Sequence, residues 1–244
     1  MKKFSRYAKN RFNSLANHLA KFGDDPRPEL LHRIRLEIKK IKVLLHVTEF
    51  CIAEFNGHKH YLPFRSVFRK AGEIRQGEVL NELFRFYKID LEGIDEKKLL
   101  ADRRKLISSF QKELPRLLLA IEMKREILMR LFKTIKRSCF EKYAYLKEKE
   151  LQKMVFPRLN QRKLHQTRKV IKEIICLSTI AGNSQKEVHS VYDKLQIMIG
   201  LWHDKQIVAT VLKTNKYHGE GKILKTECRN DIKNIRELIN QFYH

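Results

Sequence analysis

The sequence predicts an all-helical protein, and three observations support this expectation. Apolar residues recur with a period of about 3.6 almost throughout the chain, which is the spacing of one face of an α-helix. Only 9 glycines and 5 prolines interrupt the 244 residues, so strong turn signals are few. No segment shows the alternation of apolar and polar residues that is typical of a half-buried strand.

The first three expected helices are separated by turn sequences. A helix over about 4–22 ends at the turn GDDPRP, and a second over about 28–51 is followed by a loop with the sequence FNGHKHYLP. A third helix covers about 63–88, before a turn at 90–95 with the sequence DLEGID. The first helix is amphipathic, and its apolar face consists of Phe4, Tyr7, Phe12, Leu15, Leu19 and Phe22.

The rest of the chain continues the helical pattern. A strongly basic helical region covers about 95–155, and we expect an interruption near Pro115 because proline removes a helical hydrogen bond. Beyond Pro157, the expected elements are helices over about 158–180, 185–214 and 219–242, with a turn at 181–184 in which Ser184 is an N-cap.

The chain is strongly basic, with 52 Lys and Arg against 28 Asp and Glu, a net charge of +24 and a pI near 10.0. Its hydrophobic content of 43% is enough for a core and excludes a disordered tail. Such an excess of charge usually serves an anionic partner. No apolar run reaches the ~20 residues of a membrane span, so we expect no membrane insertion. The N-terminus also lacks the apolar region of a secretory signal.

Four cysteines lie far apart, without a C-x-x-C pair or a zinc-type spacing: Cys51, Cys139, Cys176 and Cys228. We therefore expect reduced structural thiols, a cytoplasmic protein and no cofactor. The sequence also offers no nucleophile–base set, no carboxylate cluster for Mg²⁺ and no glycine-rich phosphate loop, so we expect no enzymatic activity.

An internal repeat relates residues of about 28–90 to residues of about 158–214. LLHRIRLEIKKIKVLL (near 30–45) resembles KLHQTRKVIKEIICLS (163–178), and KAGEIRQGEVLNEL (70–83) resembles MIGLWHDKQIVATV (198–211). The aligned pairs are His32 with His165, Arg35 with Arg168, Gly72 with Gly200, Arg75 with His203, and Gln76 with Asp204. Duplicated helix pairs predict one domain over 1–244 with two pseudo-symmetric helical bundles, which the basic region 95–155 connects.

The helix expected at 28–51 carries a basic stripe at positions that normally hold core residues. Within an arc of about 80° lie His32, Arg35, Lys39, Lys42 and His46. Apolar strips flank the stripe, one with Leu31, Ile34, Ile38, Ile41 and Leu45, the other with Leu36, Val43 and Val47; Arg33, Glu37 and Lys40 form the ordinary polar side. Such a stripe should line a central groove or pore, where cations without acidic partners need an external anion.

The second copy has a shorter stripe, with His165, Arg168 and Lys172. Ile175 and Thr179 stand at the positions of Lys42 and His46. These residue types suit phosphate, because Arg gives bidentate contacts, Lys a mobile charge and His an N–H donor.

These segments resemble the CHAD family, the conserved histidine α-helical domain. The resemblance covers about residues 28–214 and rests on H-x-x-R-x-x-x-K-K-x-K at 32–42, G-x-x-R at 72–75, L-H-x-x-R-x-x-x-K at 164–172 and G-x-x-H-D at 200–204. It implies an all-helical fold of two similar bundles that binds inorganic polyphosphate along a basic groove or pore. By this resemblance the ligand contacts are His32, Arg35, Lys39, Lys42, Arg75, His165, Arg168, Lys172 and His203.

The sequence also departs from the family's pattern. Gln76 stands where the family usually has Asp, and Glu173 and Ile175 interrupt the basic residues of the second copy. Both departures bear on the strength of the second basic face. Next to His203, we expect Asp204 to orient a neighbouring basic residue and Trp202 to lie in the core.

The basic region 95–155 holds a further candidate set. Arg130, Lys133 and Arg137 follow one another at +3 and +4, so on one helix they would share a face and could extend the groove. A solvated surface is an equally good interpretation of these cations.

We expect the protein to bind inorganic polyphosphate without turning it over, in the cytoplasm and in association with polyphosphate granules. The alternative is a basic helical protein that binds RNA. Against the alternative, single-strand binders interleave aromatic residues with cations, and the stripe at 32–46 contains none. An enzyme that acts on phosphate polymers would need a metal-ligand set that the sequence lacks. Protein partners are not predicted.

Overall fold

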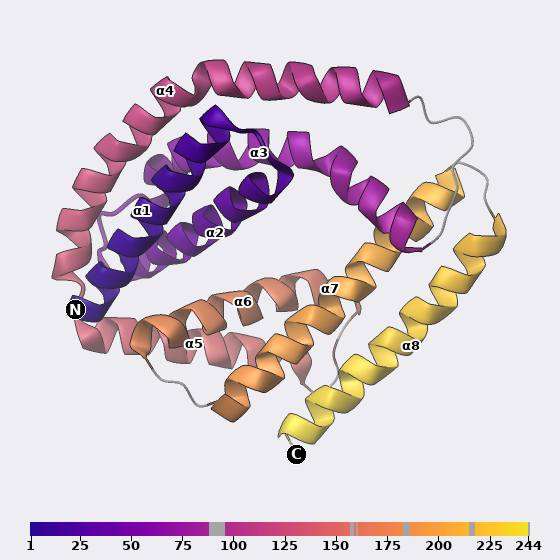
Figure 1. The fold of residues 1–244 in the computed structure, drawn as a ribbon. Coiled ribbons are helices and arrows are strands. Elements are labelled where there is room, and N and C mark those ends of the chain that lie inside the picture. Colours follow the sequence, from indigo (N-terminus) through magenta and orange to yellow (C-terminus); the bar gives the residue numbers. More distant parts are fainter. Residues whose placement is uncertain (88–95, 157–158, 160, 183–185, 215–217, 244) are drawn as a thin grey trace. The chain divides into compact units, whose positions relative to one another are not determined.

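The computed structural model describes residues 1–244 except 88–95, 157–158, 160, 183–185, 215–217 and 244. The expected turn at 90–95 and the expected N-cap Ser184 lie outside the described residues. In the described part of the chain all regular elements are helical, which confirms the all-α prediction (Figure 1). In order they are α1 (Lys2–Asp24), α2 (Pro28–Cys51), α3 (Gly57–Phe86), α4 (Glu96–Thr134), α5 (Arg137–Val155), the 3₁₀ turn η1 (Gln161–Lys163), α6 (Leu164–Ala181), α7 (Lys186–Thr214) and α8 (His218–Tyr243).

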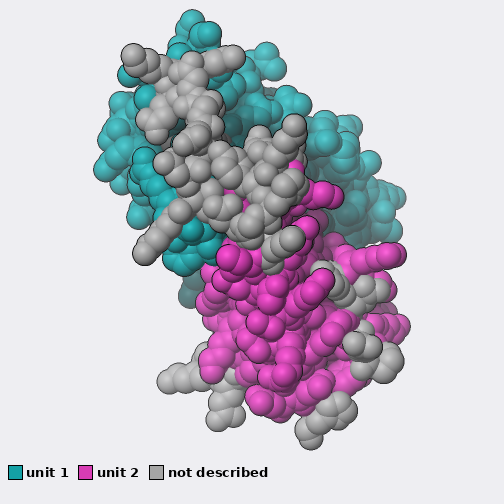
Figure 2. All heavy atoms as spheres, turned by 90° about the vertical axis from the view of Figure 1, so that its right-hand side faces the viewer, with its two compact units in different colours: residues 1–141 teal, residues 142–244 magenta. Residues whose placement is uncertain are grey.

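The chain divides into two compact units, residues 1–141 and 142–244, which Figure 2 shows in two colours. In unit 1, α2 packs between α1 and α3, and α4 packs against both α1 and α3. Aromatic residues fill much of the core of unit 1, and the edge of the Phe4 ring meets Phe132 with centroids 5.4 Å apart. The fully buried phenylalanines of this unit are Phe4, Phe12, Phe22, Phe64, Phe110, Phe132 and Phe140. The expected apolar face of the first helix is therefore part of this core, except that Tyr7 is only half-buried.

Unit 2 is built from α6, α7 and α8, together with most of α5. Helix α7 packs against both α6 and α8. The core is mainly aliphatic and includes Leu164, Ile171, Ile199 and Ile235. Trp202 is 8% exposed and belongs to this core, as the sequence predicts.

The loop predicted over FNGHKHYLP is wrong, because α3 begins at Gly57 and contains Pro63. The side chain of Asn56 accepts a hydrogen bond from the backbone N–H of Lys59 and caps the helix. Pro63 lies in the second turn of the helix, where proline removes one helical hydrogen bond, but the helix continues through it. The helix therefore begins six residues before the predicted start.

The interruption predicted at Pro115 is also wrong. Helix α4 runs through Pro115, and Figure 1 shows it as a curved rod. A proline inside a long helix can bend it without ending it. The break in this region comes later, between Thr134 and Arg137.

Two of the four cysteines form a disulfide, which corrects the expectation of four reduced thiols. Cys51 at the end of α2 bonds to Cys139 near the start of α5, and their Cα atoms are 5.9 Å apart. The two residues are 88 positions apart in sequence, so their proximity is a product of the fold. Cys176 and Cys228 are free, buried thiols.

Two further features bear on function. Among the described residues, no helix combines the length and the apolar character that crossing a membrane requires. The same residues contain no group of three or more His, Cys, Asp or Glu side chains that could hold a metal ion.

Candidate anion-binding site

The basic stripe of α2 lies at the surface of unit 1. His32, Lys39 and Lys42 are exposed, whereas Arg35 and His46 are half-buried. The first flanking apolar strip is buried throughout, from Leu31 to Leu45. In the second strip Val47 is buried but Leu36 and Val43 are only half-buried. Within unit 1 the stripe therefore borders the core on one side and reaches solvent on the other.

Arg35 is fixed against α3 by two contacts to the same residue. Its Nη1 donates a hydrogen bond of 2.7 Å to the backbone carbonyl of Phe68. Its guanidinium carbon lies over the Phe68 ring, 3.9 Å from the centroid. A planar guanidinium can stack on a ring and donate at its edges at the same time. The charge is thus held in one place while the remaining N–H groups can face a ligand.

The two lysines of the stripe lie near aromatic rings of α3. The Lys39 ammonium lies 5.9 Å from the centroid of the Phe68 ring. The Lys42 ammonium lies 5.3 Å from the centroid of the Tyr61 ring. Sequence reasoning missed Tyr61 and Phe68 because their segment was in part assigned to a loop. Tyr61, Phe64 and Phe68 are spaced +3 and +4, and this helical spacing was the signal that could have placed them on one face.

Among the described residues, no carboxylate contributes to the pKa shift of Arg35. Burial is the main cause that lowers the pKa of Arg35, and the nearby Arg75 guanidinium lowers it further. Only Tyr61 acts in the opposite direction among the described groups that shift this pKa. An anion brought to this place would stabilise the charged guanidinium.

Arg75 of α3 contacts Nδ1 of His32 on α2. Arginine is always a donor, so Nδ1 is the acceptor in this contact and the ring proton lies on Nε2. This contact joins α2 to α3 within unit 1, and the sequence did not predict it.

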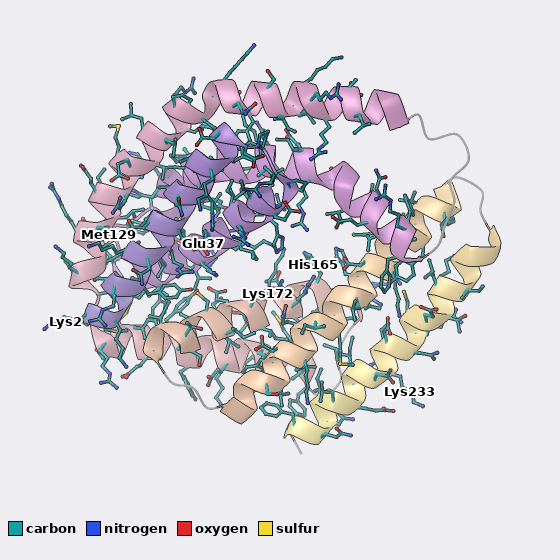
Figure 3. All side chains as sticks on the ribbon, viewed as in Figure 1. Lys2, Glu37, Met129, His165, Lys172 and Lys233 are labelled. Atoms are coloured by element: carbon teal, nitrogen blue, oxygen red, sulfur yellow. A yellow bond between two sulfur atoms is a disulfide. The ribbon has the colours of Figure 1, made fainter. Side chains whose placement is uncertain are left out.

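The corresponding residues of unit 2 lie on α6 and α7. His165 is exposed, and Arg168 and Lys172 are half-buried; Figure 3 labels His165 and Lys172 on α6. The Arg168 Nε donates a hydrogen bond of 3.0 Å to the backbone carbonyl of Gln196. The rings of His165 and His203 have centroids 4.9 Å apart.

Unit 2 differs from unit 1 in having a carboxylate near its cations. Burial is the main cause that lowers the pKa values of Arg168 and Lys172. Asp204 opposes this effect at both residues, since its negative charge favours their charged forms. Asp204 thus acts electrostatically on the neighbouring cations, and its expected role in orienting one of them stays a prediction.

The two helix pairs place their arginines in the same way. Phe68 and Gln196, whose carbonyls accept from Arg35 and Arg168, each precede a glycine by four residues, Gly72 and Gly200. Both guanidiniums lie against the glycine of the facing helix. The contacts of the two arginines are therefore equivalent in register, although Arg35 donates through Nη1 and stacks on Phe68 whereas Arg168 donates through Nε.

Comparison with known proteins supports this description of the fold. No family model matches the sequence, and no curated protein is similar to it. The structure, however, resembles the crystal structure of the CHAD domain from the plant Ricinus communis with a TM-score of 0.70. The match covers 98% of this chain and 91% of that chain, at 12% sequence identity. The chain has the CHAD fold. The family resemblance of the sequence motifs is thereby confirmed at the level of the fold.

The sequence predicted that Arg130, Lys133 and Arg137 share one helix face and could extend the site, but they do not lie on one helix. Arg130 and Lys133 are exposed near the end of α4, but Arg137 lies in α5, beyond the break. Arg137 forms an ion pair with Glu141 at 2.7 Å. The periodicity argument for these three residues is therefore wrong.

The polar side assigned to α2 also needs a correction. Glu37 is 5% exposed, and its Oε1 accepts from Arg11 of α1 at 3.1 Å and from Lys40 at 2.9 Å. The carboxylate is buried because two cations compensate its charge. Lys40 is thus part of the packing between α1 and α2 and is unsuitable as a neutral control for the stripe.

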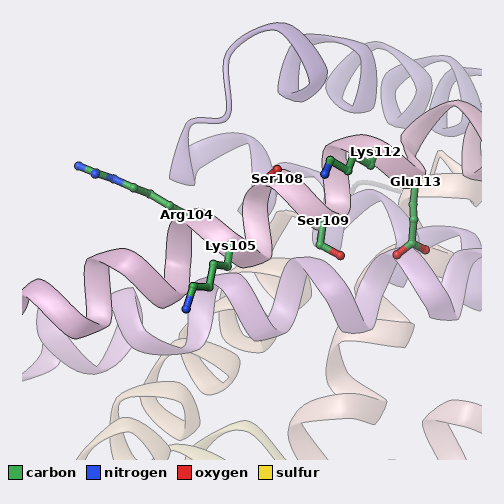
Figure 4. Close-up of a pocket in the computed structure, with 6 residues that line it drawn as sticks. All are labelled: Arg104, Lys105, Ser108, Ser109, Lys112 and Glu113. Atoms are coloured by element: carbon green, nitrogen blue, oxygen red, sulfur yellow. The ribbon is translucent and has the colours of Figure 1, made fainter.

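A second basic surface lies on α4. A pocket of about 700 Å³ is lined by Arg104, Lys105, Ser108, Ser109, Lys112 and Glu113 (Figure 4). Two of its charges have partners, because Lys105 lies 3.7 Å from Asp102 and Glu113 lies 2.6 Å from Lys70. Figure 4 shows Arg104 extending away from α4. This surface is an open helix face and lacks the fixed arginine of the α2 stripe.

Proposed function

We propose that the protein binds inorganic polyphosphate, a long polyanion, without turning it over. The observation that carries this proposal is the pair of half-buried arginines, Arg35 and Arg168, each fixed to a backbone carbonyl of the facing helix. The CHAD motifs of the sequence imply the same ligand. Both stripes are proposed to contact it, through His32, Arg35, Lys39, Lys42, His46 and Arg75 in unit 1 and His165, Arg168, Lys172 and His203 in unit 2.

The chemistry of the α2 stripe suits a chain of phosphates. Arg35 is held at a fixed place, and arginine can bind two phosphate oxygens at once. Lys39 and Lys42 are exposed, and a lysine side chain has a flexible stem, so both can follow a flexible chain. Polyphosphate carries roughly one charge per unit and no bases, and its binding should weaken with salt as counterions are released.

RNA is the second candidate, and the positions of the aromatic residues argue against it. Phe68 and Tyr61 lie next to the stripe, but cations of the stripe lie over both rings. A base would have to displace these cations in order to stack there. Polyphosphate needs no such platform.

Competition between the two polyanions tests the proposal. The protein would bind a labelled long-chain polyphosphate at near-physiological salt, and unlabelled polyphosphate or structured RNA would be added at equal phosphate concentration. We expect polyphosphate to displace the label much more effectively than RNA. Displacement by RNA at the same phosphate concentration would overturn the proposal.

The absence of turnover is part of the proposal and has its own test. Purified protein would be incubated with polyphosphate and Mg²⁺ or Mn²⁺, and the chain lengths would be analysed on a gel. We expect unchanged chains. Shortening that depends on the protein would identify an enzyme instead.

The proposed cellular location, in the cytoplasm at polyphosphate granules, rests on the proposed ligand alone, because the Cys51–Cys139 disulfide removes the argument from reduced thiols. A fluorescent fusion of the protein should collect at the granules. The same localisation with an Arg35→Glu/Lys39→Glu variant would show that the stripe is not what recruits it.

A further inference from the structure

Arg35 and Arg168 each donate to a backbone carbonyl that lies inside a helix and faces a helical N–H group. In α3 the carbonyl of Phe68 faces the N–H of Gly72, and in α7 the carbonyl of Gln196 faces the N–H of Gly200, by the register of the α-helix. A carbonyl oxygen has two lone pairs and can accept a second hydrogen bond. The second donor must then approach from the side of the helix.

Side chains normally hinder that approach. The Cα–Cβ bond of a helical residue is tilted toward the N-terminus, so a side chain covers the turn that precedes it. The residue four positions after a carbonyl therefore stands beside that carbonyl. At both places in this protein the residue is glycine, Gly72 and Gly200.

The geometry shows that the glycines are required by the arginines. A Cβ atom at Gly72 would overlap Nη1 of Arg35 and lie 3.2 Å from its Cζ. A Cβ atom at Gly200 would overlap Nη2 of Arg168 and lie 2.8 Å from its Cζ. Both glycines lie inside long helices, where glycine lowers helix stability relative to alanine. Their helical positions alone would favour alanine.

A third helical glycine provides the contrast. A Cβ atom at Gly23 in α1 would lie 3.5 Å from Cδ1 of Leu114, which is ordinary van der Waals contact. Alanine fits at Gly23 without displacing a charged group.

We propose that Gly72 and Gly200 are positioning residues, which leave the Phe68 and Gln196 carbonyls open so that Arg35 and Arg168 are held at fixed places for an anionic ligand. This inference rests on the proposed function for the identity of the ligand. It adds that the arginines are placed by the backbone geometry of the facing helices.

Polyphosphate affinity and its salt dependence test the proposal in the full-length protein. The variants are Gly72→Ala, Gly200→Ala and the matched control Gly23→Ala. We expect Gly72→Ala and Gly200→Ala each to weaken binding by about tenfold, since one charge-assisted contact is lost. Each should also reduce the slope of log K against log salt by about one phosphate contact. Gly23→Ala should change neither quantity.

The variant Arg35→Gln separates this inference from the proposed function. If Arg35→Gln weakens binding and Gly72→Ala does not, the positioning role is wrong while the ligand assignment stands. If Arg35→Gln has no effect, the ligand assignment at α2 is itself wrong. If both weaken binding, combining them should add nothing, because Gly72 acts through Arg35.

If Gly72→Ala folds poorly, the midpoint of thermal unfolding can be compared between this variant and the double variant. The double variant Arg35→Gln/Gly72→Ala has a shorter, uncharged side chain opposite the new methyl group. We expect it to recover the stability that Gly72→Ala loses. Equal destabilisation with and without Arg35 would mean that the glycine serves the packing of α3 alone, which overturns the proposal.

Discussion

The helix pairs α2/α3 of unit 1 and α6/α7 of unit 2 share their geometry and differ in their charge. In both pairs an arginine donates to a carbonyl four residues before a glycine, and a histidine meets a basic residue of the facing helix. Unit 2, however, has Asp204 where unit 1 has Gln76, and it has Ile175 and Thr179 where unit 1 has Lys42 and His46. The two helix pairs thus have the same backbone arrangement around the arginine. Unit 2 has fewer cations in its stripe, and a carboxylate lies near them.

This difference teaches where the stronger phosphate contacts should lie. In unit 2 part of the positive charge is already compensated by a carboxylate of the protein itself. In unit 1 burial lowers the pKa of Arg35, and the neighbouring Arg75 guanidinium lowers it further. We therefore expect unit 1 to contribute more to polyphosphate affinity than unit 2.

The largest expected effect comes from charge reversal on α2. Arg35→Glu/Lys39→Glu removes two charge-assisted contacts, so polyphosphate affinity should fall at least about 100-fold, or about 3 kcal/mol. The equivalent change in unit 2, Arg168→Glu/Lys172→Glu, should cost about tenfold because Asp204 already offsets part of the charge there. Fluorescence titration measures both, with circular dichroism to verify the helix content.

Lys112→Glu/Arg116→Glu provides the matched control for α2. Lys112 and Arg116 are exposed on α4, four residues apart like Arg35 and Lys39. The control changes the net charge by the same amount. Equal losses from the α2 and α4 variants would show that diffuse charge, and no defined site, explains binding.

A second effect separates the stability of the two units. Unit 1 contains the Cys51–Cys139 disulfide, which closes a long loop, so Cys51→Ser/Cys139→Ser should lower the free energy of unfolding of unit 1 by about 2–5 kcal/mol. Trp202, the single tryptophan of the chain, lies in unit 2 and reports on that unit. In urea, the unfolding transition measured by circular dichroism should therefore move to a lower urea concentration. The transition measured by tryptophan fluorescence should stay unchanged.

The buried thiol Cys228 of unit 2 supplies the comparison for that experiment. Cys228→Ala should shift the tryptophan transition and leave Cys51–Cys139 intact. An equal shift of both signals in Cys51→Ser/Cys139→Ser would mean that the two units unfold as one.

A smaller effect is expected from exchanging the residue types of Asp204 in unit 2 and its counterpart Gln76 in unit 1. Asp204→Asn should raise polyphosphate affinity by about two- to fivefold, and Gln76→Asp should lower it by a similar factor, as for a partly exposed charge pair. Asp193→Asn is the control, since Asp193 is exposed on α7 as well. Weaker binding by Asp204→Asn would show that the carboxylate serves the site by orienting its cations more than by offsetting them.

The smallest effect concerns pH. Burial lowers the pKa of Lys172, so this lysine loses its proton at a lower pH than an ordinary lysine. Deprotonation removes a positive charge, and polyphosphate affinity should therefore decline as the pH rises through that lowered pKa. In Lys172→Arg the decline should move to higher pH, because arginine stays charged. An identical pH profile for both proteins would mean that Lys172 does not contact the ligand.

The sequence predicted the helices and the repeated residues well, because both are expressed in local spacing. The bounds of α2 agree with the expected 28–51, and its first apolar strip, from Leu31 to Leu45, is buried. The early start of α3 was missed because Gly57 and Pro63 are turn signals, and the Asn56 cap that overrides them depends on a single side chain. Helix α4 continues through Pro115 because a proline in a long helix need not end it.

The contacts that define the site could be foreseen only in part. The repeat placed Arg75 and His203 at equivalent positions, but the contact of Arg75 with His32 was not foreseen. The carbonyls of Phe68 and Gln196 carry no signal in the residue type. The Cys51–Cys139 bond and the buried Glu37 depend on helices distant in sequence. The arrangement of the two stripes around one groove stays a prediction.

A crystal structure of the protein with a short-chain polyphosphate tests the central claim most directly. The account predicts phosphate oxygens within hydrogen-bond distance of the Arg35 guanidinium and of the Arg168 guanidinium. Phosphates bound only at other basic surfaces, such as the α4 face with Lys105 and Lys112, would contradict it.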